Sequence, residues 1–553
     1  MKTLLLWAIG CLLSTSAAWA QTTWLWAESV PNVQVNDVAT NLFGDVFVTG
    51  SFQVPVTFSS PYFKGTLTPV GTRDLFLARF DALGRVKWAR QVGGSGANAS
   101  GTALALDGLG SAYVVGTFTD DTLTVNTGAA PLAFVPGSLS NIRTCVLKYA
   151  TATGTVEWSR RGGGGGPDSR NCVPADVAAS PSGCYVIGNF GSRAVFEQVM
   201  LSGLRQSSVF VASYSPAGAL RWANASKVVT NGPAPISVAQ AQAASIALDA
   251  AGDCYVTGRY FFGDFELGGL LLPYSDYTRL FVTRLAGATG VAQWTRGVTA
   301  PPAGPDRADG TSIAVFGNAC YVGGTAPGAL QFDSTQTATR SFEAPTARGY
   351  LARYHTQTGT LSWIRPLLDA TAPVEVAVTI GRVLTSSTVR PPAGGAAAAT
   401  VWAHRPNGDY LWTTQVSGGN SSGLAVLGPV VYLAGAYSGT VSFGPHTLTA
   451  PAEGGAGYVA QLWIGGRITF PAAPSEAPAL LAFPNPATDE LRLQLAEGTR
   501  GVVLLDQFGH VVRQQAGQAL HTSLDVRSLA PGVYWLRYEG AKGRGAVAVE
   551  VKH

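Results

Sequence analysis

The sequence predicts an all-β protein: a seven-bladed β-propeller closed by its N-terminal strand, followed by a small C-terminal β-sandwich. Three observations predict this class. The composition is rich in turn residues, with 67 glycines and 32 prolines among 553 residues. A strand-like string ending in glycine recurs about every 64 residues. After Gly465 this repeat stops, and alternating strands of another pattern begin.

The composition also excludes some classes of function. Charged residues make up 13% of the chain, about half the usual share, and hydrophobic residues 46%. The formal net charge is only +4. A disordered chain is therefore excluded, and no nucleic-acid or anionic-membrane partner is expected.

The N-terminus has the pattern of a secretory signal peptide over residues 1–20. Lys2 provides the positive start, Thr3–Leu13 is apolar, and small residues precede a predicted cleavage between Ala20 and Gln21. The apolar run is shorter than the roughly 20 residues of a membrane-spanning helix, and no later segment is a candidate. We therefore expect an exported, soluble chain.

Each repeat contains four strand-like segments. The string that defines it occurs at Phe47–Gly50, Tyr113–Gly116, Tyr185–Gly188, Tyr255–Gly258, Tyr321–Gly324 and Tyr432–Gly435, with a degenerate copy near Val383. A small apolar run precedes each copy, and an alternating strand and a strand with one tryptophan follow it. These tryptophans are Trp88, Trp158, Trp222, Trp294, Trp363 and Trp412. Four short strands separated by turns are typical of a propeller blade.

The first three strands of the repeat each occur seven times, but the strand with a tryptophan follows them only six times. The missing copy lies at the start of the chain, where Trp26–Val30 matches Trp88–Val92. The seventh blade, which ends near Trp463, should therefore take its outer strand from the N-terminus. This arrangement closes the ring and covers strand edges that would otherwise be exposed. The propeller is expected to span residues 21–466.

The repeat resembles the bacterial SBBP-type β-propeller repeat. The matching strings are Gly44–Phe52, Phe76–Phe80 and Gly84–Trp88, and the resemblance covers about residues 22–465, with blade six departing most. It implies a secreted or surface protein, in a group whose roles are mostly unassigned.

The tryptophans have a structural and a functional interpretation. On the outer strand they are expected to pack between blades. The strings Ala288–Trp294, Thr358–Trp363 and Thr153–Trp158 also look like the docking motif of quinoprotein propellers. However, the period is longer than in that family, and no Ca²⁺-ligand cluster with a catalytic aspartate stands out. Packing is the favoured interpretation, and no cofactor is expected.

A proline-rich linker is predicted at residues 467–478 and a separate module at 479–553. Its alternating strands at Leu491–Leu495, Val502–Leu505 and Val533–Tyr538 predict a small β-sandwich. The strings Phe483–Ala487, Leu505–Gly509 and Leu529–Tyr534 resemble, in order and spacing, the type A C-terminal sorting domain of the type IX secretion system. An ordinary immunoglobulin-like module is the alternative.

The sorting-domain resemblance implies function as well as fold. Its motif residues here are Pro484, Asn485, Pro486, Asp506, Gly509, Leu529, Pro531, Gly532 and Tyr534. It implies that the type IX secretion machinery is a partner, and that the chain crosses the outer membrane of a Bacteroidetes-type bacterium. It also implies release or anchoring at the cell surface.

The cysteines give no indication of a redox or zinc site. Five follow the predicted cleavage, and Cys184, Cys254 and Cys320 hold the same position in three repeats. Equivalent positions in different blades lie apart, so these thiols should be buried and unpaired. No Cys-x-x-Cys spacing occurs.

No catalytic or metal site is predicted. The six histidines are scattered, and no nucleophile elbow or phosphate-binding loop is present. Long loops are expected on one face, at Phe52–Arg73, Val92–Gly101, Thr119–Ile142, Arg160–Pro174 and Gly297–Gly310. We therefore expect a monomeric, non-enzymatic binding or adhesion module for an extracellular glycan or protein. The alternative is a secreted quinoprotein-like or carbohydrate-active enzyme with its site at the channel mouth, so enzymatic activity stays undecided. Acidic or histidine groups clustered at that mouth would favour the enzyme.

Overall fold

The computed structural model describes most of the chain from residue 22 onward. The described residues are 22–119, 123–125, 142–164, 170–228, 239–299, 307–326, 330–332, 340–342, 349–367, 370, 374–390, 395–451, 454–464, 481–483, 487–494, 499–505, 511–516, 521–540 and 543–552. They form strands and turns without helices, and so contain no helix that could cross a membrane. The all-β class is confirmed. The predicted signal peptide with its cleavage residues Ala20 and Gln21, and the predicted linker at residues 467–478, lie outside the described residues.

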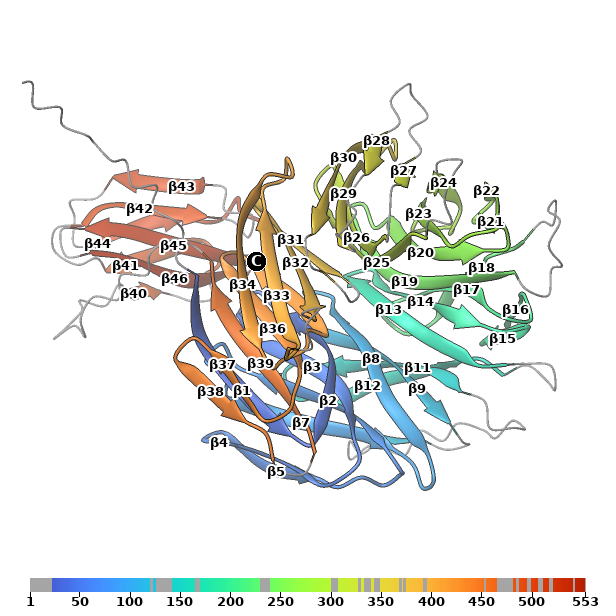
Figure 1. The fold of residues 1–553 in the computed structure, drawn as a ribbon. Coiled ribbons are helices and arrows are strands. Elements are labelled where there is room, and N and C mark those ends of the chain that lie inside the picture. Colours follow the sequence, from blue (N-terminus) through green and yellow to red (C-terminus); the bar gives the residue numbers. More distant parts are fainter. Residues whose placement is uncertain are drawn as a thin grey trace, which may run out of the picture.

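Each blade contains four antiparallel strands that pair side by side, as predicted (Figure 1). Blade one contains β2 (Val33–Thr40), β3 (Val46–Phe52), β6 (Asp74–Phe80) and β7 (Val86–Gly93). Blade two contains β8 (Asn98–Leu106), β9 (Ser111–Thr119), β11 (Arg143–Ala150) and β12 (Val156–Gly162). Blade three contains β13 (Cys172–Ser180), β14 (Gly183–Phe190), β17 (Ser208–Tyr214) and β18 (Leu220–Ala225).

The remaining blades follow the same order. Blade four contains β19 (Gln240–Leu248), β20 (Cys254–Phe261), β23 (Arg279–Leu285) and β24 (Ala292–Thr299). Blade five contains β25 (Asp309–Phe316), β26 (Ala319–Thr325), β29 (Gly349–His355) and β30 (Leu361–Leu367). Blade six contains β31 (Glu375–Thr379), β32 (Arg382–Val389), β33 (Ala398–His404) and β34 (Tyr410–Ser417).

Blade seven combines the two ends of the repeat region. It contains β35 (Gly423–Leu427), β36 (Val430–Tyr437), β39 (Ala456–Trp463) and β1 (Thr23–Pro31). β1 pairs antiparallel with β39, from Thr23 opposite Trp463 to Pro31 opposite Ala456. In Figure 1 the blue β1 lies beside the orange β39. The first strands of successive blades contact one another in turn, and β35 contacts β2.

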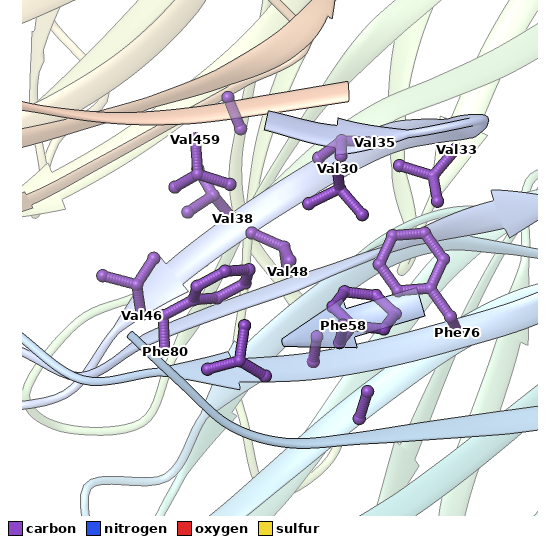
Figure 2. Close-up of a cluster of buried hydrophobic side chains, with 14 of the residues drawn as sticks. Val30, Val33, Val35, Val38, Val46, Val48, Phe58, Phe76, Phe80 and Val459 are labelled. Atoms are coloured by element: carbon purple, nitrogen blue, oxygen red, sulfur yellow. The ribbon is translucent and has the colours of Figure 1, made fainter. Parts of the chain in front are cut away.

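A hydrophobic cluster joins the two ends of the ring. Val30 on β1 and Val459 on β39 pack with Val38 and Val48 of blade one (Figure 2). Phe58, which lies between the second and third strands of blade one, belongs to the same cluster. Each of these side chains is at most 4% exposed. Burial of this apolar surface therefore stabilises the contact between blades seven and one.

Short hairpins interrupt most blades between their second and third strands. They are β4 (Val56–Ser60) with β5 (Phe63–Leu67), β15 (Arg193–Phe196) with β16 (Val199–Ser202), β21 (Gly263–Leu267) with β22 (Leu270–Ser275), β27 (Leu330–Phe332) with β28 (Arg340–Phe342), and β37 (Thr440–Phe443) with β38 (His446–Thr449). Blade two has β10 (Thr124–Val125) at this place. β10, β15 and β27 pair with the outer strand of the preceding blade. These insertions therefore link neighbouring blades.

The C-terminal region forms two sheets. One contains β40 (Leu481–Phe483), β41 (Glu490–Gln494) and β44 (His521–Asp525). The other contains β43 (Val511–Ala516), β42 (Thr499–Leu505), β45 (Gly532–Gly540) and β46 (Gly543–Val551). Leu491 and Leu493 from the first sheet share one buried cluster with Leu504, Leu536 and Val549 from the second. This shared core is independent of the clusters in the blades.

Candidate functional site

The tryptophans of the outer strands form the contacts between blades. Six indole nitrogens donate to a backbone carbonyl in the turn between the third and fourth strands of the next blade. The pairs are Trp26 to Ala82, Trp88 to Thr151, Trp158 to Pro216, Trp222 to Gly287, Trp294 to Thr356 and Trp363 to Pro406, at 2.7–3.1 Å. This geometry supports the packing interpretation, because both the ring and its polar hydrogen are used within the protein.

Trp412 is the exception. It lies on the outer strand of blade six, and its indole nitrogen is buried without a hydrogen-bond partner among the described residues. In blade seven the third and fourth strands are β39 and β1, which come from opposite ends of the repeat region. The connecting turn that supplies the acceptor at the other seams does not exist there.

Acidic side chains occur on the innermost strands, as a channel-mouth site would require. Asp37 accepts backbone hydrogen bonds from Val38 and, in the next blade, Leu104, both at 2.7 Å. Asp176 accepts from Val177 at 2.7 Å and from Ile246 at 2.9 Å in the same manner. These carboxylates therefore join neighbouring inner strands through their backbones.

Burial and mutual repulsion favour the protonated forms of these acids. Burial raises the pKa of Asp176 to about 6. Burial, and secondly the charge of Asp176, raise the pKa of Glu375 to about 7. The same two causes raise the pKa of Asp37. Within the described residues, no group of three or more histidine, cysteine, aspartate or glutamate side chains is arranged to hold a metal ion.

The loop face is the end of the ring that carries the connections between second and third strands and between successive blades. Two bridges show that these connections meet: Arg73 pairs with Asn98, and Ser207 pairs with Gln240. The predicted loop lengths were partly wrong. Only residues 94–97 separate β7 from β8, and Phe52–Arg73 is mostly the hairpin β4–β5. Parts of the other three segments lie outside the described residues.

The blade-four pocket is a cavity of about 340 Å³ on the loop face. Its lining residues come from the ends of β19 and β20, from the segment before β23 and from the segment before β25: Gln240, Gln242, Arg259, Phe261, Phe262, Asp276, Tyr277, Thr278 and Arg307. Phe262 and Tyr277 are 39% and 42% exposed. The pocket combines aromatic surface with planar polar groups, a combination that suits recognition of a small ligand.

The blade-one pocket lies between blade one and the preceding blade, blade seven, which contributes Ala436 and Gly454–Ala456. It measures about 490 Å³, and its lining includes Gln34, Ser51, Val54, Arg73 and Gly455. The blade-four pocket instead includes Arg307, from the segment that leads into the following blade. By strand register Gln34 opposes Ser51 as Gln242 opposes Arg259. The two pockets therefore use equivalent positions of their own blades with different side chains, and different neighbouring blades complete them.

Sequence reasoning did not identify the residues of the blade-four pocket. Phe262 follows the repeat glycine Gly258 by four positions, where blade seven has Gly439. Both have positive φ values, 53° and 69°. An aromatic residue at a turn position that favours glycine was the available signal, but the turn conformation only becomes known from the structure.

The sorting-domain motif is only partly within the described residues. Leu529 and Tyr534 are buried at 8% and 7% exposure, and the Tyr534 hydroxyl donates to the Ala530 carbonyl at 2.8 Å. Pro531 and Gly532 are exposed between them. The remaining motif residues, Pro484, Asn485, Pro486, Asp506 and Gly509, lie outside the described residues.

The five described cysteines, Cys145, Cys172, Cys184, Cys254 and Cys320, are all buried and unpaired, which agrees with the prediction for the three repeat-equivalent positions Cys184, Cys254 and Cys320. Burial raises the pKa of Cys145 and Cys172 to about 12. They act as small apolar core residues.

Known proteins resemble this chain in two regions. Residues 481–548 match the secretion system C-terminal sorting domain, and residues 87–117 match the beta-propeller repeat SBBP. Among curated protein sequences, none matches the chain.

Solved structures with some likeness include BamB from Moraxella catarrhalis, at 12% identity and a TM-score of 0.35, covering 80% of this chain and 100% of BamB. A europium-containing methanol dehydrogenase has 13% identity and a TM-score of 0.37, covering 80% and 93%. PorZ, a surface component of the type-IX secretion system of Porphyromonas gingivalis, has 10% identity and a TM-score of 0.18, covering 95% and 100%. By its two family matches, the chain therefore contains an SBBP β-propeller repeat and a type IX secretion system C-terminal sorting domain, and the sorting domain indicates export to the cell surface or the extracellular space.

Proposed function

We propose that this protein is a non-enzymatic binding or adhesion module that acts outside the cell through its loop face. The sorting domain supplies the route of export. The observation that carries the proposal is the blade-four pocket, where exposed aromatic and polar side chains gather on a rigid ring. Recognition residues are commonly held in this way on loops of a stable scaffold.

The hydrogen bonds of the inner-strand acids support binding rather than catalysis. Both carboxylate oxygens of Asp37 and of Asp176 accept hydrogen bonds from backbone N–H groups. A carboxylate used in this way stabilises the contact between strands. The indole nitrogens of six outer-strand tryptophans are likewise occupied at the seams.

The domain limits belong to the same proposal. We assign residues 1–20 to a signal peptide cleaved between Ala20 and Gln21, 21–466 to the propeller, 467–478 to a linker and 479–553 to the sorting domain. The nine motif residues named above would be read by the secretion machinery, and the exported protein would be a monomer.

The test compares the two faces of the ring. Mature full-length protein is applied to an oligosaccharide array and to surfaces coated with purified extracellular-matrix proteins. One variant replaces residues 94–97 and Asp276–Thr278 by Gly-Ser. The control changes Leu83 and Leu109, exposed apolar residues in turns at the opposite end, to serine. We expect the loop-face variant alone to lose binding; loss only in the control would contradict the proposal.

One observation favours the enzyme alternative. The pKa of Glu375 is raised to about 7, and a carboxyl group with such a pKa can act as a general acid near neutral pH. Under this alternative, the wild-type protein would hydrolyse a soluble polysaccharide and the Glu375→Gln variant would not. Under the binding proposal, neither protein releases reducing sugar.

A further inference from the structure

Phe262 adopts a backbone conformation that is unfavourable for a bulky residue. Its φ is 53°, in the left-handed region where a side chain crowds the backbone. The equivalent turns of blades three and seven have Ser192 at 58° and Gly439 at 69°. Glycine therefore fits this turn without strain. Blade four keeps a phenylalanine at a cost in stability, and such strain is characteristic of functional positions.

The strained turn places an aromatic ring at the pocket. Phe262 as a residue is 39% exposed, and its ring lies edge-to-face with that of Phe261, with centroids 5.4 Å apart. Tyr277, on another segment of the pocket wall, is 42% exposed. The Arg279 guanidinium lies 5.5 Å from the Tyr277 ring centre, and Arg279 itself is only 7% exposed. Phe262 and Tyr277 are therefore both exposed to solvent, and each packs against a neighbour, Phe261 and Arg279, respectively.

Polar groups of the same pocket are also held in place. The Gln242 side-chain oxygen accepts two hydrogen bonds from Arg259, at 2.9 and 2.6 Å, and Arg259 also donates to Asp309 at 3.0 Å. With its oxygen occupied, the Gln242 amide nitrogen can donate to a ligand. Asp276 accepts from the Tyr274 hydroxyl at 2.7 Å and has further acceptor capacity.

Arg307 adds a positive charge at the rim. It is exposed, and it has no ion pair with the part of the chain that the structure describes. A guanidinium of this kind can take a carboxylate through two parallel hydrogen bonds.

These groups match the surface of a sugar. A pyranose ring has a C–H face that packs on an aromatic ring, and a rim of hydroxyls that bond to planar amide, guanidinium and carboxylate groups. The cavity of about 340 Å³ is at the small end of ligand pockets. A protein partner would instead need about 800 Å² of complementary surface on each side.

The blade-one pocket shows that the fold alone does not produce this chemistry. It keeps Gln34 at the position of Gln242, but has Ser51 in place of Arg259 and Val54 in place of Phe262. It is larger, yet it lacks the exposed aromatic pair. The combination of groups that suits a sugar ligand is therefore a property of the blade-four side chains.

We propose that the blade-four pocket binds an oligosaccharide, with a sugar ring against Phe262 and Tyr277 and its hydroxyls bonded to Gln242 and Asp276. Arg307 favours chains that contain uronic acid. This inference rests on the proposed binding function and names its ligand class.

The test uses calorimetric titration of the mature full-length protein with cellohexaose and with hexagalacturonate. Phe262→Gly removes the ring and relieves the turn, whereas Ser192→Gly makes the same backbone change in blade three, away from the pocket. We expect Phe262→Gly to weaken binding at least tenfold with an unchanged or higher melting temperature, and Ser192→Gly to bind like the wild type. Arg307→Ala should weaken binding of hexagalacturonate more than that of cellohexaose.

The outcomes separate this inference from the proposed function. If the wild type binds either sugar and Phe262→Gly binds it equally well, the pocket assignment is wrong. If neither sugar binds but the loop-face variant loses adhesion to matrix proteins, the glycan inference fails and the binding function stands. If binding to sugars and proteins is independent of the loop face, both are overturned.

Discussion

The indole nitrogen of Trp26 donates a hydrogen bond of 3.0 Å to the backbone carbonyl of Ala82, 56 residues away. Trp26 lies on β1 of blade seven, and Ala82 lies in the turn between the last two strands of blade one. The same contact recurs at five other seams. The N-terminal strand thus makes the same contact with its neighbour as an ordinary outer strand does.

Trp26→Ala should destabilise the propeller more than Trp412→Ala. Trp26 is 8% exposed and hydrogen-bonded, whereas Trp412 is partly buried with no acceptor among the described residues. We expect losses of about 3–5 kcal/mol and about 1–2 kcal/mol, respectively, in the free energy of unfolding. Urea denaturation of both variants measures the difference. Equal losses would show that the indole hydrogen bond and burial do not set the strength of the seam.

Gly154→Ala should be more damaging than Gly108→Ala. Both glycines have positive φ values, 69° and 76°. A Cβ on Gly154 would lie 2.9 Å from the Trp88 indole, whereas one on Gly108 would meet nothing within 4 Å. Strain alone should cost about 1–2 kcal/mol at Gly108, and displacement of the indole should raise the loss at Gly154 to about 2–4 kcal/mol. Thermal unfolding of the two variants compares these losses, and similar melting temperatures would argue against close packing of turn and tryptophan.

The cysteine thiols should be unreactive in the folded protein. Burial raises the pKa of Cys145 and Cys172 to about 12, so almost no thiolate is present at pH 8. Titration with Ellman's reagent should detect no rapidly reacting thiol under native conditions and all five described cysteines in guanidinium chloride. Fast reaction of one thiol in the native protein would mean that its blade opens or is packed differently.

The inner-strand acids should make the protein less stable as the pH rises. The pKa of Asp176 is raised to about 6 and that of Glu375 to about 7. Between about pH 4 and pH 7 the folded state therefore holds protons that the unfolded state releases, and stability falls as the pH increases through this window. Glu375→Gln removes one of these groups, so its melting temperature should fall less than that of the wild type between pH 4 and 8. Parallel pH profiles would refute the raised pKa of Glu375.

The number of blades and the order of strands within them could be predicted from the sequence because the same strand pattern is repeated. Strings such as Tyr255–Gly258 recur at a steady spacing, and counting the tryptophan strands located the N-terminal partner of β39. Even the degenerate copy near Val383 forms β32.

The pocket could not be predicted in the same way because it depends on differences between the repeats. Gln242, Phe262 and Tyr277 are separated in the chain, and only the strand register and the turn after β20 bring them to one cavity. The sequence also overestimated loop lengths, because strands continue beyond the residues that match the repeat. For example, β7 extends to Gly93 and β8 already begins at Asn98.

The loop face is rigid only if the ring is closed, and the ring is closed only if β1 is a true strand of the last blade. Hydrogen–deuterium exchange of the mature protein tests this directly. Backbone amides of residues 23–30 that pair with β39 should be protected for as long as those of β36. Exchange of residues 23–30 at the rate of an unstructured peptide, while β36 stays protected, would contradict the closed ring.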